Sequence, residues 1–366
     1  MRPAHFGALA PVCPVCRRAG RGASPLALVQ AIRTDEEDPA RIVEGLVRCP
    51  HAACRREYPV IDGVPLLIAD LRGHVAGGLL PLLARDDLSE LTESLLGDCA
   101  GPGSELDTLR RELSTYGEDH YGDLEAEPCS ESDSGAGSAV RLLAALLEAA
   151  GPALGGLPAG PALDVGCAVG RTTFELAARL GRPALGVDLN FSMLRLAQGV
   201  LGRGVARYPR RRVGVVYDRR EVAADLPGRG GADFWAADAA ELPFEDGRFA
   251  LVAGLNVIDC VTAPRDVLSE LARVLAPGGL ALIATPYDWT PAATPFEQWL
   301  GGHSQRHEGR GAGEPVLRAL LTPGGHAASV EGVEIVAEVD GLPWRLRLHE
   351  RSLVEYRVHG VVVRKA

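Results

Sequence analysis

Lysine, methionine and aromatic residues are scarce in this chain, which also has no long uninterrupted apolar run. Lys365 is the only lysine, and aromatic residues make up 5% of the 366 residues. Because the basic side chains are almost all arginine, we attach no functional meaning to the arginine count. The longest apolar stretch, residues 140–165, is broken by Glu148, prolines and glycines. A single bilayer-spanning helix is therefore not expected there, and the sequence predicts no membrane partner.

An excess of positive charge is also missing. The formal net charge is −10 at pH 7, which disfavours nucleic acid as a partner because phosphate contacts need clustered positive charge. A small-molecule substrate fits a negative net charge better. The net charge does not identify a protein partner. The first ten residues lack the apolar segment of a secretory signal, and four of the eight cysteines have metal-ligand spacing. We therefore expect a cytoplasmic location.

The length predicts more than one folding unit. Residues 1–70 contain the closely spaced cysteines and short β-branched runs that favour small strands and a hairpin. Residues 71–137 are expected to be a helical connector that ends in an acidic loop, and residues 138–366 to be the largest domain. There, helices are expected over residues 138–150, 172–180, 191–200 and 265–275, and strands over 162–165, 184–187, 233–236, 250–255 and 280–284. This alternation predicts a parallel α/β sheet, and the tail at 333–364 is expected to add antiparallel edge strands.

Two cysteine pairs indicate a metal site near the start of the chain. Cys13 and Cys16 are separated by two residues, and Cys49 and Cys54 by four. Four thiolates at such spacing suit structural Zn²⁺. His51 is an alternative ligand, although an exposed loop histidine is the simpler interpretation.

The segment that follows the second pair, Tyr58-Pro-Val-Ile-Asp-Gly-Val-Pro65, is similar to the small zinc-ribbon proteins that activate methyltransferases. That resemblance implies a module that stabilises a catalytic domain or places its substrate, here within the same chain. The remaining cysteines are interpreted as structural, with Cys167 in the loop described next; they are Cys99, Cys129, Cys167 and Cys260.

A glycine-bearing turn after an apolar strand is the most informative segment. The run Ala162-Leu-Asp-Val-Gly-Cys-Ala-Val-Gly170 closes a strand and opens a helix. Asp188 stands at the end of the next expected strand and Asp238 at the end of the third. A carboxylate at the position of Asp188 can accept hydrogen bonds from both hydroxyls of a ribose.

This order of acid, Gly-x-x-x-Gly, acid and acid resembles the class I S-adenosylmethionine-dependent methyltransferases. The resemblance implies a doubly wound, Rossmann-like α/β fold with a seven-stranded methyltransferase sheet, beside the small zinc-ribbon-like β domain. Asp164 and the glycines would shape the methionine pocket, Asp188 would hold the ribose, and Asp238 with Ala239 would meet the adenine. The implied cofactor-binding set is Asp164, Gly166, Cys167, Ala168, Gly170, Asp188, Leu189, Met193, Asp238, Ala239 and Asn256.

A narrower resemblance extends over residues 116–363. The segments around His120, Asn256 and Trp289 are similar to the methyltransferase domain of ovothiol-biosynthesis proteins, which methylates an imidazole nitrogen of a mercaptohistidine. It implies catalytic or substrate-contacting roles for Asn256, Tyr287, Trp289 and Tyr121. The sequence departs from that family at residues 290–293, which replace an expected acidic pair, and in its N-terminal domain.

The sequence therefore favours N-methylation of a small molecule such as an imidazole- or thioimidazole-containing amino acid derivative. One alternative is a methyltransferase that acts on RNA or protein, with the zinc-ribbon-like domain placing the substrate. A second is a noncatalytic binding protein that keeps the fold. The Arg-rich run at 203–220 could bind a phosphate or carboxylate, but an exposed insertion is the preferred interpretation.

Overall fold

The computed structural model describes residues 1–71, 101–125, 135–306 and 308–366. Cys99, Cys129, His307, the first part of the expected connector and most of the acidic loop lie outside these ranges. The described part of the connector is one helix, α6 (Glu105–Tyr121), whose first turn is capped by Ser104: its hydroxyl accepts a hydrogen bond from the backbone N–H of Asp107.

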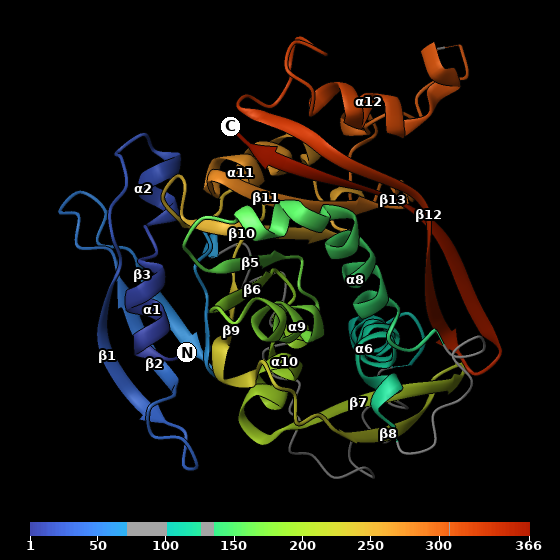
Figure 1. Ribbon diagram of the computed structural model, residues 1–366. Helices are drawn as coiled ribbons and strands as arrows, with labels where there is room; N and C mark the ends of the chain where they lie inside the picture. The colour runs from blue at the N-terminus through green and yellow to red at the C-terminus, as the bar shows by residue number, and fades with distance from the viewer. Residues whose placement is uncertain (72–100, 126–134, 307) are drawn as a thin grey trace.

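The predicted seven-stranded sheet is confirmed. Five strands run parallel, and β13 pairs antiparallel with both β11 and β12. Figure 1 shows β9 at one edge of this sheet and the C-terminal β12–β13 pair at the other. In spatial order the strands are β12 (Val333–His349), β13 (Ser352–Lys365), β11 (Leu275–Thr285), β10 (Phe249–Leu255), β5 (Ala162–Val165), β6 (Ala184–Asp188) and β9 (Ala232–Ala236).

Helices cover both faces of the sheet, as expected for a doubly wound fold. Leucines of α8 (Ser138–Ala150) and α9 (Arg171–Leu180) pack with one set of strand side chains, and α10 (Phe191–Arg203) packs beside β9. On the other face lie α11 (Pro264–Val274) and α12 (Gly313–Leu320). Short 3-10 turns occur at Gly122–Leu124, Gly151–Gly156, Arg229–Gly231, Ile258–Cys260, Phe296–Gln298 and Glu308–Gly311.

One described segment, Ser138–Gly156, is long and apolar enough by length and composition alone to cross a membrane. It contains α8, whose Leu142, Leu143, Leu146 and Leu147 are buried in the cluster that covers the sheet. These contacts explain the apolar sequence as that of a core helix.

The N-terminal residues form a separate four-stranded antiparallel sheet, which we call the N-terminal module (residues 1–71). Its strands are, in order, β1 (Ala27–Thr34), β2 (Ile42–Arg48), β3 (Glu57–Ile61) and β4 (Val64–Pro65). Two short helices, α1 (Pro3–Leu9) and α2 (Pro14–Arg18), precede them. Small strands and a hairpin were expected here, and the described strands agree with that prediction.

The module is joined to the β9 edge of the large sheet (Figure 1). Leu66 forms a parallel bridge with Ala236, and the backbone N–H of Leu67 donates to the carbonyl of Ala236 at 2.9 Å. Beside this bridge, the buried carboxylate of Asp233 accepts hydrogen bonds from the backbone N–H of Arg2 and the side-chain amide of Gln198. The module therefore covers a sheet edge that would otherwise expose unpaired backbone groups.

The Arg-rich run is not the exposed insertion that we expected. It forms a hairpin of β7 (Val205–Val213) and β8 (Val216–Ala223), and the hairpin packs against α6. Tyr208 is 2% exposed and its hydroxyl donates to Glu118 of α6. Arg220 donates two hydrogen bonds to Glu125. Part of the arginine charge is thereby neutralised inside the protein.

Candidate active site

A cavity of about 540 Å³ lies at the carboxyl ends of the central strands, where ligands bind in open α/β sheets. Its volume falls within the range of about 300–1,000 Å³ that is usual for sites holding a small organic ligand. The lining comes from the loops that follow β5, β6, β9 and β10, from α6, and from Trp344 of β12. Segments more than 200 residues apart in the chain thus form one wall.

The turn between β5 and α9 requires backbone conformations that favour glycine. Gly166 has φ +70° and Gly170 has φ +89°. A Cβ atom on Gly166 would lie 2.7 Å from Val257, and one on Gly170 would lie 2.6 Å from Phe234. Ala168 also adopts a left-handed conformation, with φ 48°. This conformation is strained for alanine, because alanine has a Cβ atom and glycine does not.

Asp188 connects this turn to the end of β6. Its Oδ2 accepts a hydrogen bond from the backbone N–H of Ala168 at 2.9 Å, and its Oδ1 accepts from the N–H of Asn190 at 2.8 Å. Burial raises the pKa of the Asp188 carboxyl, against these amide contacts. The carboxylate is thus fixed at the cavity wall with lone pairs left for a ligand's hydroxyls.

Asp164 lies beneath the turn and is almost fully buried. The hydroxyls of Thr172 and Thr173 both donate to its Oδ2 at 2.7 Å. Burial raises the pKa of this carboxyl to about 6, although both hydroxyls favour the ionised form. Asp164 therefore holds the start of α9 against the end of β5, and it also borders the cavity.

Most residues of the predicted cofactor set meet at this cavity. Nine of the eleven line it, namely Asp164, Gly166, Ala168, Asp188, Leu189, Met193, Asp238, Ala239 and Asn256. The other two lie behind the lining. Cys167 is buried under the turn, and Gly170 packs against Phe234.

Asn256 is the predicted catalytic residue that the structure places at the cavity. It follows β10 with φ 53°, and its backbone N–H donates to the carbonyl of Ala284. Its side-chain Oδ1 is buried without a hydrogen-bond partner among the described residues. A buried amide oxygen in that state favours a ligand with an N–H or O–H group.

The other three predicted catalytic residues lie away from the cavity lining. The hydroxyl of Tyr121 donates to the carbonyl of Val169 at 2.7 Å, so this side chain supports the glycine-bearing turn. The hydroxyl oxygen of Tyr287 lies 2.7 Å from Nδ1 of His359. Trp289 stacks on Trp299, with ring centroids 6.2 Å apart. These contacts assign packing to side chains for which we had predicted chemistry.

We expect Trp289→Ala to act on stability. Removing the ring should lower the free energy of unfolding by about 2 kcal/mol, and the thermal midpoint by about 5 °C, because its stacking with Trp299 is lost. The affinity for a ligand of the cavity should stay within about twofold, since Trp289 does not border the cavity. Calorimetric melting and titration of the variant test both. A tenfold loss of affinity at an unchanged melting temperature would contradict this assignment.

Helix α6 contributes a face of which we predicted only the end, around His120. Glu112, Tyr116, Asp119 and His120 recur at helical spacing and line the cavity together. Their spacing of four, three and one is visible in the sequence, but nothing local indicates that this face turns toward the glycine-bearing turn. His120 connects α6 to this turn, because its Nδ1 accepts a hydrogen bond from the backbone N–H of Arg171. Burial lowers the pKa of the His120 side chain to about 3.

The four predicted metal ligands also converge. The Sγ atoms of Cys13, Cys16, Cys49 and Cys54 all lie within 4.8 Å of one another. The pairs Cys13–Cys54 and Cys16–Cys49 are each 3.7 Å apart, close to the edge of about 3.8 Å in a tetrahedron with Zn–S bonds of about 2.3 Å. His51 accepts a hydrogen bond from the N–H of Ala53 and is not in this cluster. The donor set and its spacing fit Zn²⁺.

Comparison with known proteins bears on the large domain. Residues 163–283, which run from β5 to β11, match the family described as a methyltransferase domain. The chain contains a methyltransferase domain. The matched residues include the glycine-bearing turn, Asp188, Asp238 and Asn256, all of which lie at the cavity described above.

Two curated relatives are each similar to about a third of this chain. Chloroplastic tocopherol O-methyltransferase of Arabidopsis thaliana is 29% identical over 123 residues, 34% of this chain and 29% of the relative. Norajmaline N-methyltransferase of Rauvolfia serpentina is 29% identical over 122 residues, 33% of this chain and 34% of the relative. The chain thus spans about a third of the length of these relatives.

Solved structures with similar folds include a complex that contains the Haloferax volcanii Trm112 methyltransferase activator. It is 17% identical, has a TM-score of 0.34, and the match covers 63% of this chain and 94% of that chain.

Proposed function

We propose that this protein transfers a methyl group from S-adenosylmethionine to a nitrogen atom of a small molecule, such as an imidazole- or thioimidazole-containing amino acid derivative. One observation carries the proposal: Asp164, Asp188 and Asp238, from the ends of three adjacent strands, border one cavity within a methyltransferase domain. Amino-acid composition alone would not bring these three side chains to one cavity.

The lining residues fit the cofactor. Asp188 would accept hydrogen bonds from the ribose hydroxyls, and Asp238 with Ala239 would border the adenine. Because Nδ1 of His120 accepts a hydrogen bond, the neutral ring carries its proton on Nε2 and can donate into the cavity. The cofactor supplies an electrophilic methyl group on a sulfonium, so the chain's task is to orient the acceptor and exclude water.

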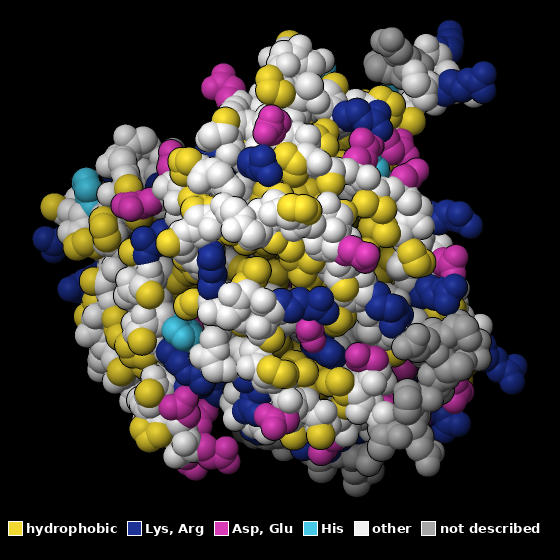
Figure 2. Space-filling view, viewed as in Figure 1, with side chains coloured by type: hydrophobic (Ala, Val, Ile, Leu, Met, Phe, Trp, Pro, Cys, Tyr) yellow, Lys and Arg dark blue, Asp and Glu magenta, His cyan; other side chains and the backbone are white. Residues whose placement is uncertain are grey.

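Asn256 supports a nitrogen acceptor. Its Oδ1 lacks a partner in the described structure and borders the cavity, so it would accept a hydrogen bond from an N–H group and orient the nitrogen lone pair. The relatives named above are, by name, a tocopherol O-methyltransferase and a norajmaline N-methyltransferase. Tocopherol and norajmaline are both small molecules, in agreement with the chain's net charge of −10. On the face seen in Figure 2, basic side chains are interspersed with acidic ones.

Methyl-labelled S-adenosylmethionine tests this function directly. The protein is incubated in parallel with mercaptohistidine-type compounds, with bulk RNA and with cell-extract proteins. Label in the small-molecule pool supports the proposal. Label in RNA or protein would favour the alternative in which the N-terminal module places a macromolecule. Cofactor binding without label in any pool would favour a noncatalytic binding protein.

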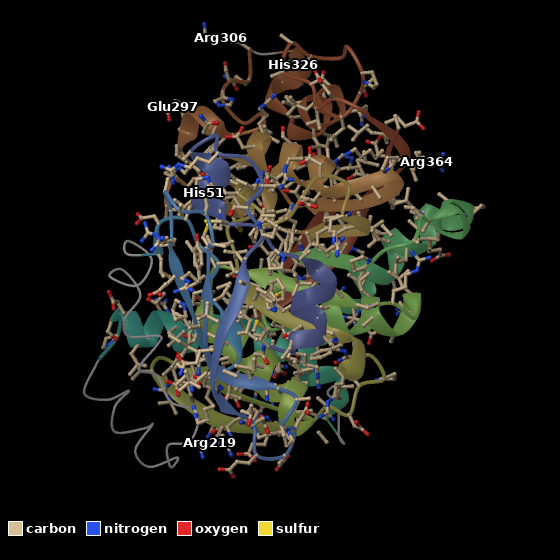
Figure 3. All side chains as sticks on the ribbon, turned by 90° about the vertical axis from the view of Figure 1, so that its left-hand side faces the viewer. His51, Arg219, Glu297, Arg306, His326 and Arg364 are labelled. Carbon is tan, nitrogen blue, oxygen red and sulfur yellow. The ribbon has the colours of Figure 1, made fainter. Side chains whose placement is uncertain are left out.

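We further propose that the four cysteines hold one structural Zn²⁺ and that the N-terminal module stabilises the catalytic domain in the same chain. Tyr58 Oη lies 3.1 Å from Cys13 Sγ, and Ser24 Oγ lies 3.3 Å from Cys49 Sγ. Such neighbours orient thiolate ligands. Figure 3 places His51 in this module, between Arg306 at the upper end of the view and Arg219 of the β7–β8 hairpin at the lower end.

The acids that line the cavity predict that the relative affinity for S-adenosylmethionine and S-adenosylhomocysteine depends on pH. Burial raises the pKa of Asp119 to about 7 and that of Asp164 to about 6. Raising the pH from 5.5 to 8 therefore adds negative charge, which favours the cationic sulfonium of S-adenosylmethionine over the neutral sulfur of S-adenosylhomocysteine. We expect the ratio of their affinities to increase by roughly tenfold toward the cationic form. Calorimetric titration of both compounds measures this ratio, and a flat ratio would contradict the assignment of these acids to the cavity.

A further inference from the structure

The cavity is lined by one sign of charge. Five carboxyl groups border it: Glu112, Asp119, Asp164, Asp188 and Asp238. Because burial raises the pKa of Asp119 to about 7 and that of Asp164 to about 6, the lining reaches its full negative charge above neutral pH. Among the described residues that line it there is no lysine and no arginine. His120 adds no positive charge at neutral pH, because burial lowers its pKa to about 3. A cleft with this lining concentrates cations and repels anions.

The cofactor accounts for only part of this charge. Asp164, Asp188 and Asp238 stand at the ends of the strands and belong to the proposed cofactor half. Glu112 and Asp119 come from α6 instead, and S-adenosylmethionine carries a net charge of only about +1 at neutral pH. Glu112 Oε2 also accepts a hydrogen bond from Nδ2 of Asn190 at 2.9 Å, close to Asp188. The acids of the lining still outnumber the single net positive charge of the cofactor, which leaves negative charge for a second ligand.

Asp119 is held rigidly in the wall. Its Oδ2 accepts a hydrogen bond from Nε1 of Trp344 at 3.1 Å, and its Oδ1 accepts from the backbone N–H of Ala139 at 3.0 Å. Trp344 itself packs against Tyr356, with ring centroids 5.1 Å apart. The arrangement fixes one acid against one indole ring, and both line the cavity.

Aromatic rings accompany the two acids of α6. Tyr116 lies on the same helix face between Glu112 and Asp119, and Trp344 borders the cavity from β12. Carboxylates together with aromatic faces form a site for an organic ammonium ion, since both attract a cation and neither binds an anion.

We propose that the methyl acceptor carries an ammonium group, and that it has no carboxylate or phosphate next to the part that enters the cavity. Glu112 and Asp119 would face the ammonium group, and Tyr116 and Trp344 would border it. This inference rests on the proposed function and narrows its substrate class from amino acid derivatives to amines without the acid group.

Matched pairs of probes test the proposal by binding alone. Histamine and histidine share the imidazole and the ammonium group, and differ in the carboxylate; tryptamine and tryptophan form a second pair. Each is titrated by calorimetry into the full-length protein saturated with S-adenosylhomocysteine. We expect the amine of at least one pair to bind about tenfold more tightly than its amino acid. Equal binding within both pairs, tighter binding of the amino acids, or no detectable binding of either amine would overturn the proposal.

Substitutions on α6 test whether Glu112 and Asp119 cause the preference for the amine. Asp119→Asn and Glu112→Gln keep the side-chain shape and remove the charge, so at least one of them should reduce the preference for the amine to about threefold or less. Asp225→Asn, at a side chain that is 96% exposed, is the matched control and should keep the preference. If both α6 variants keep it while remaining folded by circular dichroism, the assignment is wrong.

The same titrations separate this proposal from the proposed function. Binding of S-adenosylhomocysteine is recorded before either probe is added. Loss of that binding in the unmodified protein would remove the methyltransferase function itself, whereas normal cofactor binding with no amine preference removes only the substrate class.

Discussion

Asp188→Ala is expected to weaken S-adenosylmethionine binding by about 100-fold. The substitution would remove the two charge-assisted hydrogen bonds that we propose between Asp188 and the ribose, each worth about 1.5–3 kcal/mol. It also removes the acceptor that holds the backbone N–H groups of Ala168 and Asn190. Both losses act on the cofactor half of the cavity, so calorimetric titration of S-adenosylmethionine measures the effect.

Asp188→Asn provides the matched comparison, because it keeps an oxygen acceptor and removes the charge. Its affinity should lie between those of the unmodified protein and the alanine variant. Asp225→Asn should leave the affinity unchanged, since that side chain is exposed on the surface. Unchanged affinity in Asp188→Ala would remove the ribose assignment and with it the cofactor proposal.

Cys49→Ser is expected to lower the thermal midpoint by about 10 °C or more, and a strong chelator should have the same effect on the unmodified protein. Metal binding and folding are coupled in modules of this size. The module packs Phe6 against Trp235 of β9, with ring centroids 5.9 Å apart. Loss of the module therefore exposes the core of the large domain as well as its sheet edge.

Cys260→Ser is the control for this experiment, because Cys260 is exposed and lies outside the cluster. Its thermal midpoint should not change. Elemental analysis should find about one zinc per chain in the unmodified protein and little in Cys49→Ser. A metal-free protein with an unchanged thermal midpoint would leave the four cysteines as ordinary packing residues.

The parts of the fold that follow local rules could be predicted from the sequence. The glycine-bearing turn and the acids at strand ends depend on neighbours within a few residues, and Asp164, Asp188 and Asp238 line one cavity. The expected strands and helices between 162 and 285 follow hydrophobic periodicity in the same way, whereas the β7–β8 hairpin within that range was not predicted. The four cysteines converge because their spacing already limits the geometry.

The rest depended on contacts between distant segments. Asp119 meets Trp344, 225 positions away, and Tyr287 meets His359, 72 positions away. Neither pairing has a local signal. Predicting chemistry for Tyr287 and Trp289 used their place after the fifth strand of the α/β unit, but these side chains turn toward His359 and Trp299 instead. Position at a sheet edge alone did not determine which way they point.

The bridge between Leu66 and Ala236 joins the N-terminal module to the large domain within one chain. Because both belong to one polypeptide, their association is intramolecular, and its effective concentration is on the order of millimolar. A weak contact would then be almost fully formed, and dilution would not separate the parts. The pairing of one module with one catalytic domain is fixed at synthesis, without any need for the cell to balance two separate subunits.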